Sequence, residues 1–184
     1  TVGHHLKSKI AEINPNIFNE AFKNHDILVV AGFQGINEDF ELTTLGRGGS
    51  DTTAVALAAS NQTPCEIYTD VDGVYATDPR ILNEAKRLEY VSYEEMMEMS
   101  ALGAGVLETR SVELAKNYDI PLYLGRTLSN VKGTWIMPRT EILEKKAVTG
   151  VALDTHMMHV TISYPLPDNR LLTQLFTALA VSYT

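Results

Sequence analysis

Cysteine is almost missing from this sequence, since Cys65 is the single example in 184 residues. One thiol excludes an intrachain disulfide and a cysteine-based metal site, and it fits a reducing compartment, so we predict a cytoplasmic protein. The histidines show no spacing with Cys65 or with carboxylates that is typical of metal ligands. We therefore predict no metal ion held by the protein alone.

Long hydrophobic runs and clusters of basic residues are missing as well. No apolar stretch approaches the roughly 18 residues that a membrane-spanning helix needs, so we expect no membrane partner. The chain carries 15 Lys and Arg against 23 Asp and Glu, a net charge of −8. Because nucleic-acid binding needs a basic face, the scattered basic residues argue against a nucleic-acid partner. The sequence begins without Met and without a signal peptide, and we expect a piece of a longer protein.

The hydrophobic residues, 45% of the chain, follow alternating strand and helix patterns. Residues 27–31 form an unbroken β-branched run, which is typical of a buried strand in a parallel sheet. Asn14 before Pro15 predicts the start of one helix, with Ile17 on its apolar face, and Ser92 with Glu95 predicts a capping box. The expected helices are 4–23 (interrupted at Pro15), 51–61, 92–100 and 108–117, and the expected strands are 27–31, 65–69, 121–125 and 132–136. This alternation predicts an α/β domain.

A composition change follows residues 137–139, Met-Pro-Arg, which we interpret as a linker between domains 1–137 and 138–184. Period-2 alternation over residues 159–164 predicts a half-exposed antiparallel strand, and a helix is expected over 167–180. Together these elements predict an incomplete ferredoxin-like α+β unit. At 180–181 helix passes to strand without turn residues, so residues are expected to be missing there.

Residues 43–51, Thr-Thr-Leu-Gly-Arg-Gly-Gly-Ser-Asp, give the first functional signal. Glycine allows the backbone to approach a ligand closely, and a helix beginning at Ser50 or Asp51 directs free N–H groups toward it. Arg47 adds a guanidinium fork suited to a carboxylate or phosphate. No Lys-Ser/Thr follows, as a Walker A loop requires, and the Rossmann pattern lacks its third glycine. The stretch predicts a small anionic ligand or, as the plain alternative, a glycine-rich turn before a helix.

A second polar loop, residues 69–80, follows the strand expected at 65–69. Its Thr-Asp-Val-Asp-Gly start could hold a divalent cation, but Gly73 falls at the fifth position and no Glu closes the EF-hand pattern. Asp78-Pro79-Arg80 is either a simple turn or a phosphate contact at the carboxyl edge of a sheet. The remaining candidates are interpreted as core: Cys65, Met96, Met97 and Met99.

Several stretches together match one family in order and spacing: 30–35 (VAGFQG), 43–51, 69–75 (TDVDGVY), 77–80 (TDPR) and 102–107 (LGAGVL). On these motifs the chain closely resembles the aspartokinase family of the amino-acid kinase superfamily, with the start of its ACT regulatory region. The resemblance implies a partial amino-acid kinase fold, a three-layer α/β/α sandwich, followed by the incomplete ACT unit. It also implies transfer of the ATP γ-phosphate, with Mg²⁺ carried by ATP, to the side-chain carboxylate of L-aspartate. The product, 4-phospho-L-aspartate, opens lysine, threonine and methionine biosynthesis.

The resemblance also implies which residues form the site. The acceptor would be bound by Phe33, Arg47, Gly48, Gly49 and Ser50, with Arg47 and Asp51 as the catalytic residues. ATP would contact Thr69, Asp70, Tyr75, Asp78 and Arg80, together with the backbone of Gly105 and Val106. No general base is expected, because a carboxylate nucleophile is already ionised at neutral pH. Catalysis then consists of aligning two anions and neutralising their charge.

The chain also departs from the family pattern. The family's N-terminal Lys-Phe-Gly-Gly-Thr-Ser phosphate loop is absent, so we predict no kinase activity for this span alone, and some members carry lysine where Gly105 stands. Two alternatives stay open: another amino-acid kinase, or a non-catalytic regulatory chain that binds amino acids. The ACT resemblance implies lysine or threonine as effectors and a homo-oligomer formed through ACT regions. The sequence does not choose the effector, and it does not show whether a homoserine dehydrogenase is fused.

Overall fold

The structure, a computed structural model, describes residues 1–3, 6–141, 148–154, 173–174 and 176–177. The chain divides into two units, Thr1–Asp154 and Thr155–Thr184. In the second unit the described residues are helical, and the Thr177 hydroxyl donates to the Thr173 carbonyl at 2.8 Å. The strand expected at 159–164 and most of the helix expected at 167–180 lie outside the described residues.

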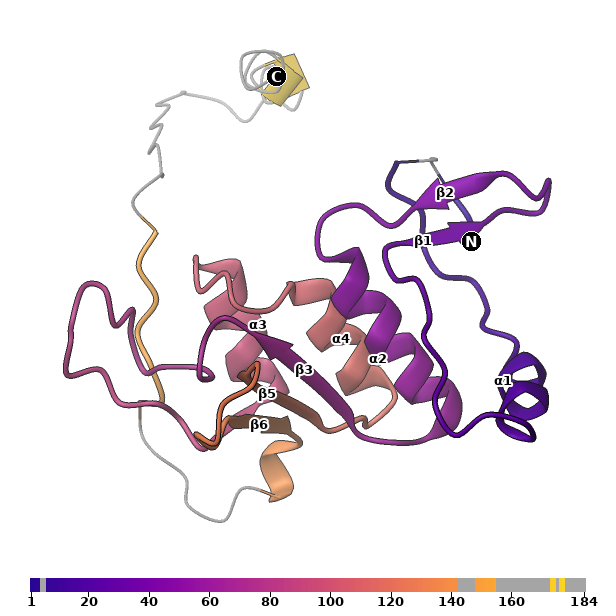
Figure 1. The fold of residues 1–184 in the computed structure, drawn as a ribbon. Helices are drawn as coiled ribbons and strands as arrows, with labels where there is room; N and C mark the ends of the chain where they lie inside the picture. The colour runs from indigo at the N-terminus through magenta and orange to yellow at the C-terminus, as the bar shows by residue number, and fades with distance from the viewer. Residues whose placement is uncertain (4–5, 142–147, 155–172, 175, 178–184) are drawn as a thin grey trace. The chain divides into compact units, whose positions relative to one another are not determined.

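A four-stranded mixed sheet in the order β3-β5-β6-β4 forms the centre of the first unit (Figure 1). Strands β3 (Cys65–Thr69) and β5 (Leu122–Arg126) are parallel, whereas β6 (Thr134–Met137) runs antiparallel to β5. The short strand β4 (Tyr90–Ser92) pairs in parallel with β6. A separate antiparallel pair consists of β1 (Gln34–Ile36) and β2 (Leu42–Thr44).

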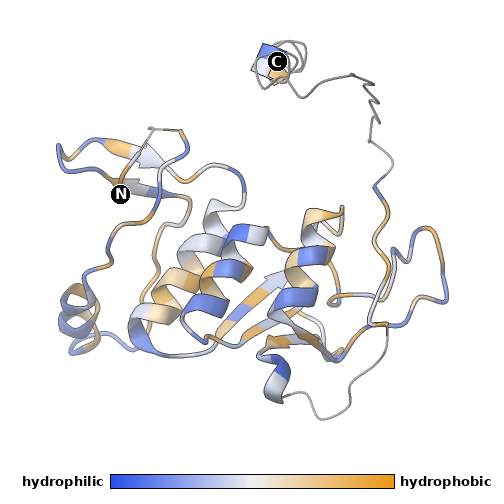
Figure 2. Cartoon of the chain, turned by 180° about the vertical axis from the view of Figure 1, so that it is seen from behind, coloured by the Kyte–Doolittle hydropathy of each residue, from blue (hydrophilic) through white to orange (hydrophobic). Residues whose placement is uncertain are grey.

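Three helices cover one face of the four-stranded sheet: α2 (Gly49–Asn61), α3 (Tyr93–Ala101) and α4 (Thr109–Asn117). Figure 2 views them from the helix side and shows hydrophilic residues on the outer surfaces of α3 and α4, whereas α2 is mostly neutral to hydrophobic. Alternate strand residues face the helices, and Leu122, Leu124 and Ile136 are fully buried there with Val55 of α2 and Val112 of α4. Burial of such side chains contributes roughly 1.5–3 kcal/mol each, and it fixes the register of the strands.

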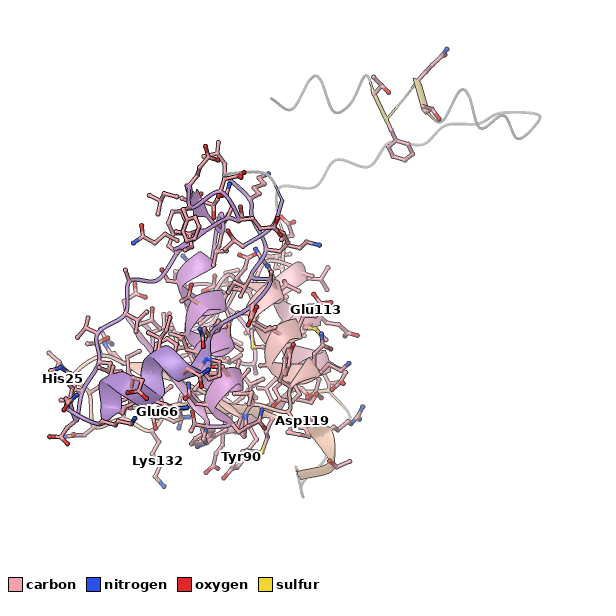
Figure 3. The ribbon with its side chains drawn as sticks, turned by 90° about the vertical axis from the view of Figure 1, so that its right-hand side faces the viewer. His25, Glu66, Tyr90, Glu113, Asp119 and Lys132 are labelled. Carbon is pink, nitrogen blue, oxygen red and sulfur yellow. The ribbon has the colours of Figure 1, made fainter. Side chains whose placement is uncertain are left out.

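The opposite face of the sheet carries aromatic and charged side chains. The rings of Tyr68 and Tyr123 lie 6.1 Å apart between centroids, and those of Tyr123 and Trp135 lie 5.0 Å apart. Figure 3 shows the labelled side chains of Glu66, Tyr90 and Lys132 on the side of the molecule away from α2 and α4. Among the described residues, the helix layer therefore lies on one face only. The mixed α/β class is confirmed, and the third layer stays a prediction.

The helix starts follow the capping residues predicted from sequence. Helix α1 (Pro15–Phe22) begins after Asn14, whose side chain accepts a hydrogen bond from the Asn16 N–H at 3.0 Å. At α3, the Ser92 hydroxyl accepts from the Glu95 N–H at 3.3 Å, and the Glu95 carboxylate accepts from the Ser92 N–H at 3.0 Å. The predicted capping box is confirmed, as are the predicted helices that became α2, α3 and α4.

The prediction of a buried strand over residues 27–31 is wrong. These residues form no strand, and Ile27 and Val29 are 82% and 96% exposed. A strand requires a neighbour for its N–H and C=O groups, and no described segment pairs with this run. The predicted apolar face of α1 also fails to pack, since the helix has no buried residue and Ile17 is 64% exposed. The short strands β1, β2 and β4 were missed, because three residues carry too little periodicity to reveal a strand.

The end of the first unit differs from the predicted linker. The short 3₁₀ turn η1 (Arg139–Glu141) follows β6, and residues 148–154 lie in the first unit, where the Val151 N–H donates to the Ala76 carbonyl at 2.7 Å. The boundary at 137/138 and the ACT assignment of the remainder stay predictions. No helix within the described ranges has the length and apolarity to cross a bilayer.

Candidate active site

The glycine-rich stretch forms a tight loop between β2 and the first turn of α2. Gly46 and Gly48 have φ values of +78° and +67°, a conformation that side chains with a Cβ rarely adopt. The Gly49 N–H donates to the Gly46 carbonyl at 3.0 Å. A Cβ added to Gly49 would lie 2.9 Å from Leu45 Cβ and 2.9 Å from Phe33 Cδ2. Glycine is therefore required both for the turn and for the close packing beneath it.

Phe33 packs against this loop from the segment before β1. Its own φ is +70°, and its backbone is held on both sides: its N–H donates to Thr53 Oγ1 at 3.2 Å, and its carbonyl accepts from the Leu45 N–H at 2.9 Å. Phe33 is 43% exposed. It packs against Gly49, within the stretch that was predicted to bind the acceptor.

Arg47 is exposed at the tip of the loop. Within the described part of the chain, its guanidinium has neither an ion-pair partner nor a hydrogen-bond partner. A guanidinium presents parallel N–H donors that match a carboxylate or phosphate. Ser50, also exposed, is the second residue of α2 and adds a hydroxyl next to the free N–H groups of the first turn.

Asp51 lies in the first turn of α2 and links this helix to α4. Its carboxylate accepts a hydrogen bond from the backbone N–H of Glu108, the residue that caps α4. Burial raises the pKa of Asp51, and the nearby Glu108 carboxylate adds to the rise, although the Glu108 N–H acts against it. The start of α2 and the start of α4 therefore meet at one half-buried carboxylate.

Two residues at this site were missed by the sequence analysis, Glu108 and Arg110. The Glu108 side chain packs directly over Gly48, so that no Cβ fits there. Arg110 donates from Nη1 to the Leu45 carbonyl at 3.0 Å and from Nη2 to the Ser8 carbonyl at 3.1 Å. The first turn of a helix usually favours acidic residues, so an arginine there is unusual. This unusual position was the signal in the sequence that could have revealed Arg110.

The predicted nucleotide loop follows β3 and is tethered to the sheet by Thr134. The Val74 N–H donates to Thr134 Oγ1 at 2.9 Å, and the same hydroxyl donates to the Leu88 carbonyl at 2.6 Å. Gly73 has a φ of +146° and leaves room for Thr134, since a Cβ there would lie 2.5 Å from the hydroxyl. Both ends of the long segment between β3 and β4 are thus held by hydrogen bonds to one buried threonine.

The polar side chains of this loop mostly contact one another. The Thr69 hydroxyl donates to the adjacent Asp70 carboxylate at 3.0 Å. The Tyr75 hydroxyl donates to Asp72 at 3.4 Å, and Arg126 at the end of β5 lies 3.6 Å from the other Asp72 oxygen. These contacts place the predicted nucleotide residues Thr69, Asp70 and Tyr75 around the carboxyl ends of the parallel strands β3 and β5.

Asp78 and Arg80 form an exposed bidentate pair, with Arg80 Nη2 2.7 Å from Asp78 Oδ2 and Arg80 Nε 3.0 Å from Oδ1. The hydrogen bonds from Arg80 hold the pKa of Asp78 below its usual range. The Arg80 side chain is 89% exposed, within a loop that extends away from the sheet (Figure 1). The structure therefore does not bring Arg80 to the Arg47 loop.

Gly105 and Val106 lie in the turn that leads into α4, next to Glu108. Helices α2 and α4 each pass through a short loop into β3 and β5, so their N-termini point toward the end at which these strands finish. The glycine loop, the turn at 105–106 and the start of the nucleotide loop consequently share one edge of the sheet. This edge is where open α/β sheets bind ligands.

Comparison with known proteins agrees with this arrangement. The amino acid kinase family matches residues 2–126. Aspartokinase 2 of Bacillus subtilis is 45% identical over 177 residues, which make up 96% of this chain and 43% of that protein. The solved aspartate kinase of Clostridium acetobutylicum has a TM-score of 0.66 and 31% identity, covering 74% of this chain and 32% of its own.

Aspartokinase III of E. coli, solved with aspartate and ADP and also with lysine and aspartate, gives TM-scores of 0.56 and 0.53. Both structures share 40% identity over 60% of this chain and 25% of their own. This chain thus spans less than half the length of these relatives. The resemblance to aspartokinases is confirmed by these identities, and the chain belongs to the amino acid kinase family.

Proposed function

We propose that this chain forms the acceptor-binding and nucleotide-binding part of an aspartate kinase, which phosphorylates the side-chain carboxylate of L-aspartate with ATP. One observation carries the proposal: Arg47 is exposed, with no partner among the residues that the structure describes, on a glycine loop that packs against Phe33 and ends at the start of α2. The relatives of this chain carry the names aspartokinase and aspartate kinase, and the structure of one was solved with aspartate and ADP. These names support aspartate as the acceptor.

The acceptor site works by charge and close approach. The Arg47 guanidinium pairs with a carboxylate of the amino acid, while the Ser50 hydroxyl and the free N–H groups of α2 supply further donors. Phe33 lines the proposed acceptor site, and Gly48 and Gly49 allow the ligand to approach the backbone. Asp51, fixed by the Glu108 N–H, orients the reacting groups from behind the loop.

Phosphoryl transfer then requires alignment more than proton transfer. The acceptor carboxylate is ionised at neutral pH and needs no base, so the barrier comes mainly from bringing two anions together. Arg47 and the N-termini of α2 and α4 reduce that repulsion because they place positive charge where negative charge accumulates.

The nucleotide is proposed to lie along residues 69–80 and the turn at 105–106. Thr69, Asp70 and Tyr75 supply polar groups at the sheet edge, Gly105 and Val106 supply backbone, and Mg²⁺ bound to the phosphates supplies charge neutralisation. The hydroxyl and backbone N–H groups can donate to phosphate oxygens, whereas the Asp70 carboxylate can only accept and suits the cation that the phosphates bring. Arg80 can exchange Asp78 for a phosphate at little cost, because water screens the attraction between exposed charges.

The remaining parts of the proposal rest on the aspartokinase resemblance. They are cytoplasmic location, an ACT unit within 138–184, feedback by lysine or threonine, and a homo-oligomer formed through ACT regions. The solved complex of aspartokinase III with lysine and aspartate supports an amino-acid effector.

Calorimetric titration of the chain with L-aspartate tests the acceptor site. We expect saturable binding that Arg47→Ala weakens about 10- to 100-fold, the effect of removing a charge-assisted hydrogen bond. L-Glutamate and UMP should bind more weakly, and Arg139→Ala, an exposed arginine in η1, serves as the matched control. Equal binding of glutamate would favour another amino-acid kinase, and binding of lysine or threonine without aspartate and ADP would favour the regulatory alternative.

A further inference from the structure

The guanidinium of Arg110 joins two chain segments that are far apart in sequence. It reaches from the first turn of α4 to the Leu45 carbonyl at 3.0 Å and to the Ser8 carbonyl at 3.1 Å. Ser8 is fully buried and Leu45 is 3% exposed. The Ser8 N–H also donates to the Thr44 carbonyl at 2.9 Å, so both contacts of the fork hold the end of β2.

Leu45 is the last fixed residue before the loop that carries Arg47. Its N–H donates to the Phe33 carbonyl at 2.9 Å, and its carbonyl accepts from Arg110. Gly46 follows with a left-handed backbone, and the loop closes again where the Gly49 N–H meets the Gly46 carbonyl at 3.0 Å. The position of Arg47 is therefore set by the orientation of the Leu45 peptide on one side and by α2 on the other.

From this geometry we infer that Arg110 is the positioning residue of the Arg47 loop, fixing the direction in which Arg47 meets the acceptor carboxylate. The inference rests on the proposed function of that loop and adds a residue to it. The two hydrogen bonds of Arg110 to Leu45 and Ser8 go to backbone carbonyls, and Arg110 acts on the loop through the Leu45 peptide. It also ties the loop to α4, the helix whose N-terminal Glu108 holds Asp51, so both catalytic candidates are positioned by the first turn of α4.

A planar fork is needed for this task. The two accepting carbonyls belong to different segments, and a guanidinium presents parallel donors to both in one plane. Lysine keeps the positive charge and most of the length, but its single nitrogen presents a different geometry and cannot reproduce the fork. Arg110→Lys is therefore the sharpest variant, since it preserves the charge near the site and removes the geometry.

The test compares Arg110→Lys with wild type and with Arg139→Lys, an exposed arginine in η1. Calorimetry with L-aspartate and, separately, with ADP should show about tenfold weaker aspartate binding in Arg110→Lys and ADP binding within twofold of wild type. A merely structural role would weaken both ligands together. Equal loss of both, or aspartate affinity equal to wild type, overturns the inference.

Hydrogen exchange of the amides of residues 46–50 provides a measurement without ligand. Exchange should become faster in Arg110→Lys and stay unchanged in Arg139→Lys, because the Leu45 peptide loses one anchor. Unchanged exchange in Arg110→Lys overturns the tether itself. If exchange becomes faster in Arg110→Lys but the wild-type chain binds no aspartate, Arg110 holds the loop as described. The proposed function and the role of Arg110 in aspartate binding are then both wrong.

Discussion

Thr134 offers the sharpest test of how the nucleotide loop is held, because its buried hydroxyl makes two hydrogen bonds to the segment between β3 and β4, at Val74 and at Leu88. Thr134→Val keeps the shape of the side chain and removes the hydroxyl. The Val74 N–H then has no acceptor in a region where Val74 is 1% exposed, which costs about 1–3 kcal/mol. The Leu88 carbonyl loses its 2.6 Å donor and retains Arg87 Nη1 at 3.4 Å, a smaller loss. We expect the free energy of unfolding to fall by about 2–4 kcal/mol in total.

Urea unfolding of the chain, followed by circular dichroism, measures this change. Thr134→Ser is the matched control, because it keeps the hydroxyl and loses one methyl group, worth about 1 kcal/mol. An unchanged slope of the unfolding free energy against urea concentration in both variants would show that unfolding still exposes the same amount of surface. The reasoning is refuted if Thr134→Val is as stable as Thr134→Ser, since the two buried hydrogen bonds would then contribute nothing measurable.

Two further predictions concern the ends of the helices. Ser92→Ala removes both hydroxyl contacts of the capping box at α3 and should lower stability by about 1 kcal/mol in the same unfolding assay; Ser60→Ala, outside any N-cap, should cost clearly less. Burial raises the pKa of Asp51, so its contribution to stability is present below the ordinary pKa and is lost as pH rises through the raised one. Asp51→Asn keeps an oxygen for the Glu108 N–H and should therefore gain stability relative to wild type as pH rises above the ordinary pKa of aspartate; melting temperatures of the two proteins that converge as pH rises would contradict the assignment.

The parts of the fold that the sequence predicted well are those set by neighbouring residues. Asn14 and Ser92 cap their helices through contacts two and three residues away, and such contacts can be read from the order of residues. The strand at 65–69 was predicted with its observed bounds, because apolar length and flanking turn residues both marked it. Cys65 was also interpreted correctly: it is 6% exposed, and burial raises the pKa of its thiol to about 11.

The site was predicted where one motif carries it and missed where the fold brings distant segments together. Residues 46–51 are contiguous, so the loop and the helix start were visible in the sequence. Arg110 contacts carbonyls 65 and 102 positions away. Every residue has a backbone carbonyl, so the sequence does not indicate which carbonyls accept a hydrogen bond from a distant side chain. Thr134 shows the same limit, because the groups that it joins are the backbone of Val74 and Leu88.

Residues 27–31 show that a β-branched run favours burial but does not by itself predict a strand. Burial of such a run is favourable, at roughly 1.5–3 kcal/mol for each large aliphatic side chain. A strand also needs a neighbouring strand, because its N–H and C=O groups must find hydrogen-bond partners. The run itself does not indicate whether such a neighbour is present. Val29 is 96% exposed here, whereas Leu122 and Leu124, which lie in a similar short run, are fully buried between β3 and β6. The difference between the two runs therefore lies in the neighbouring strands rather than in the residues, and propensity alone could not have distinguished them.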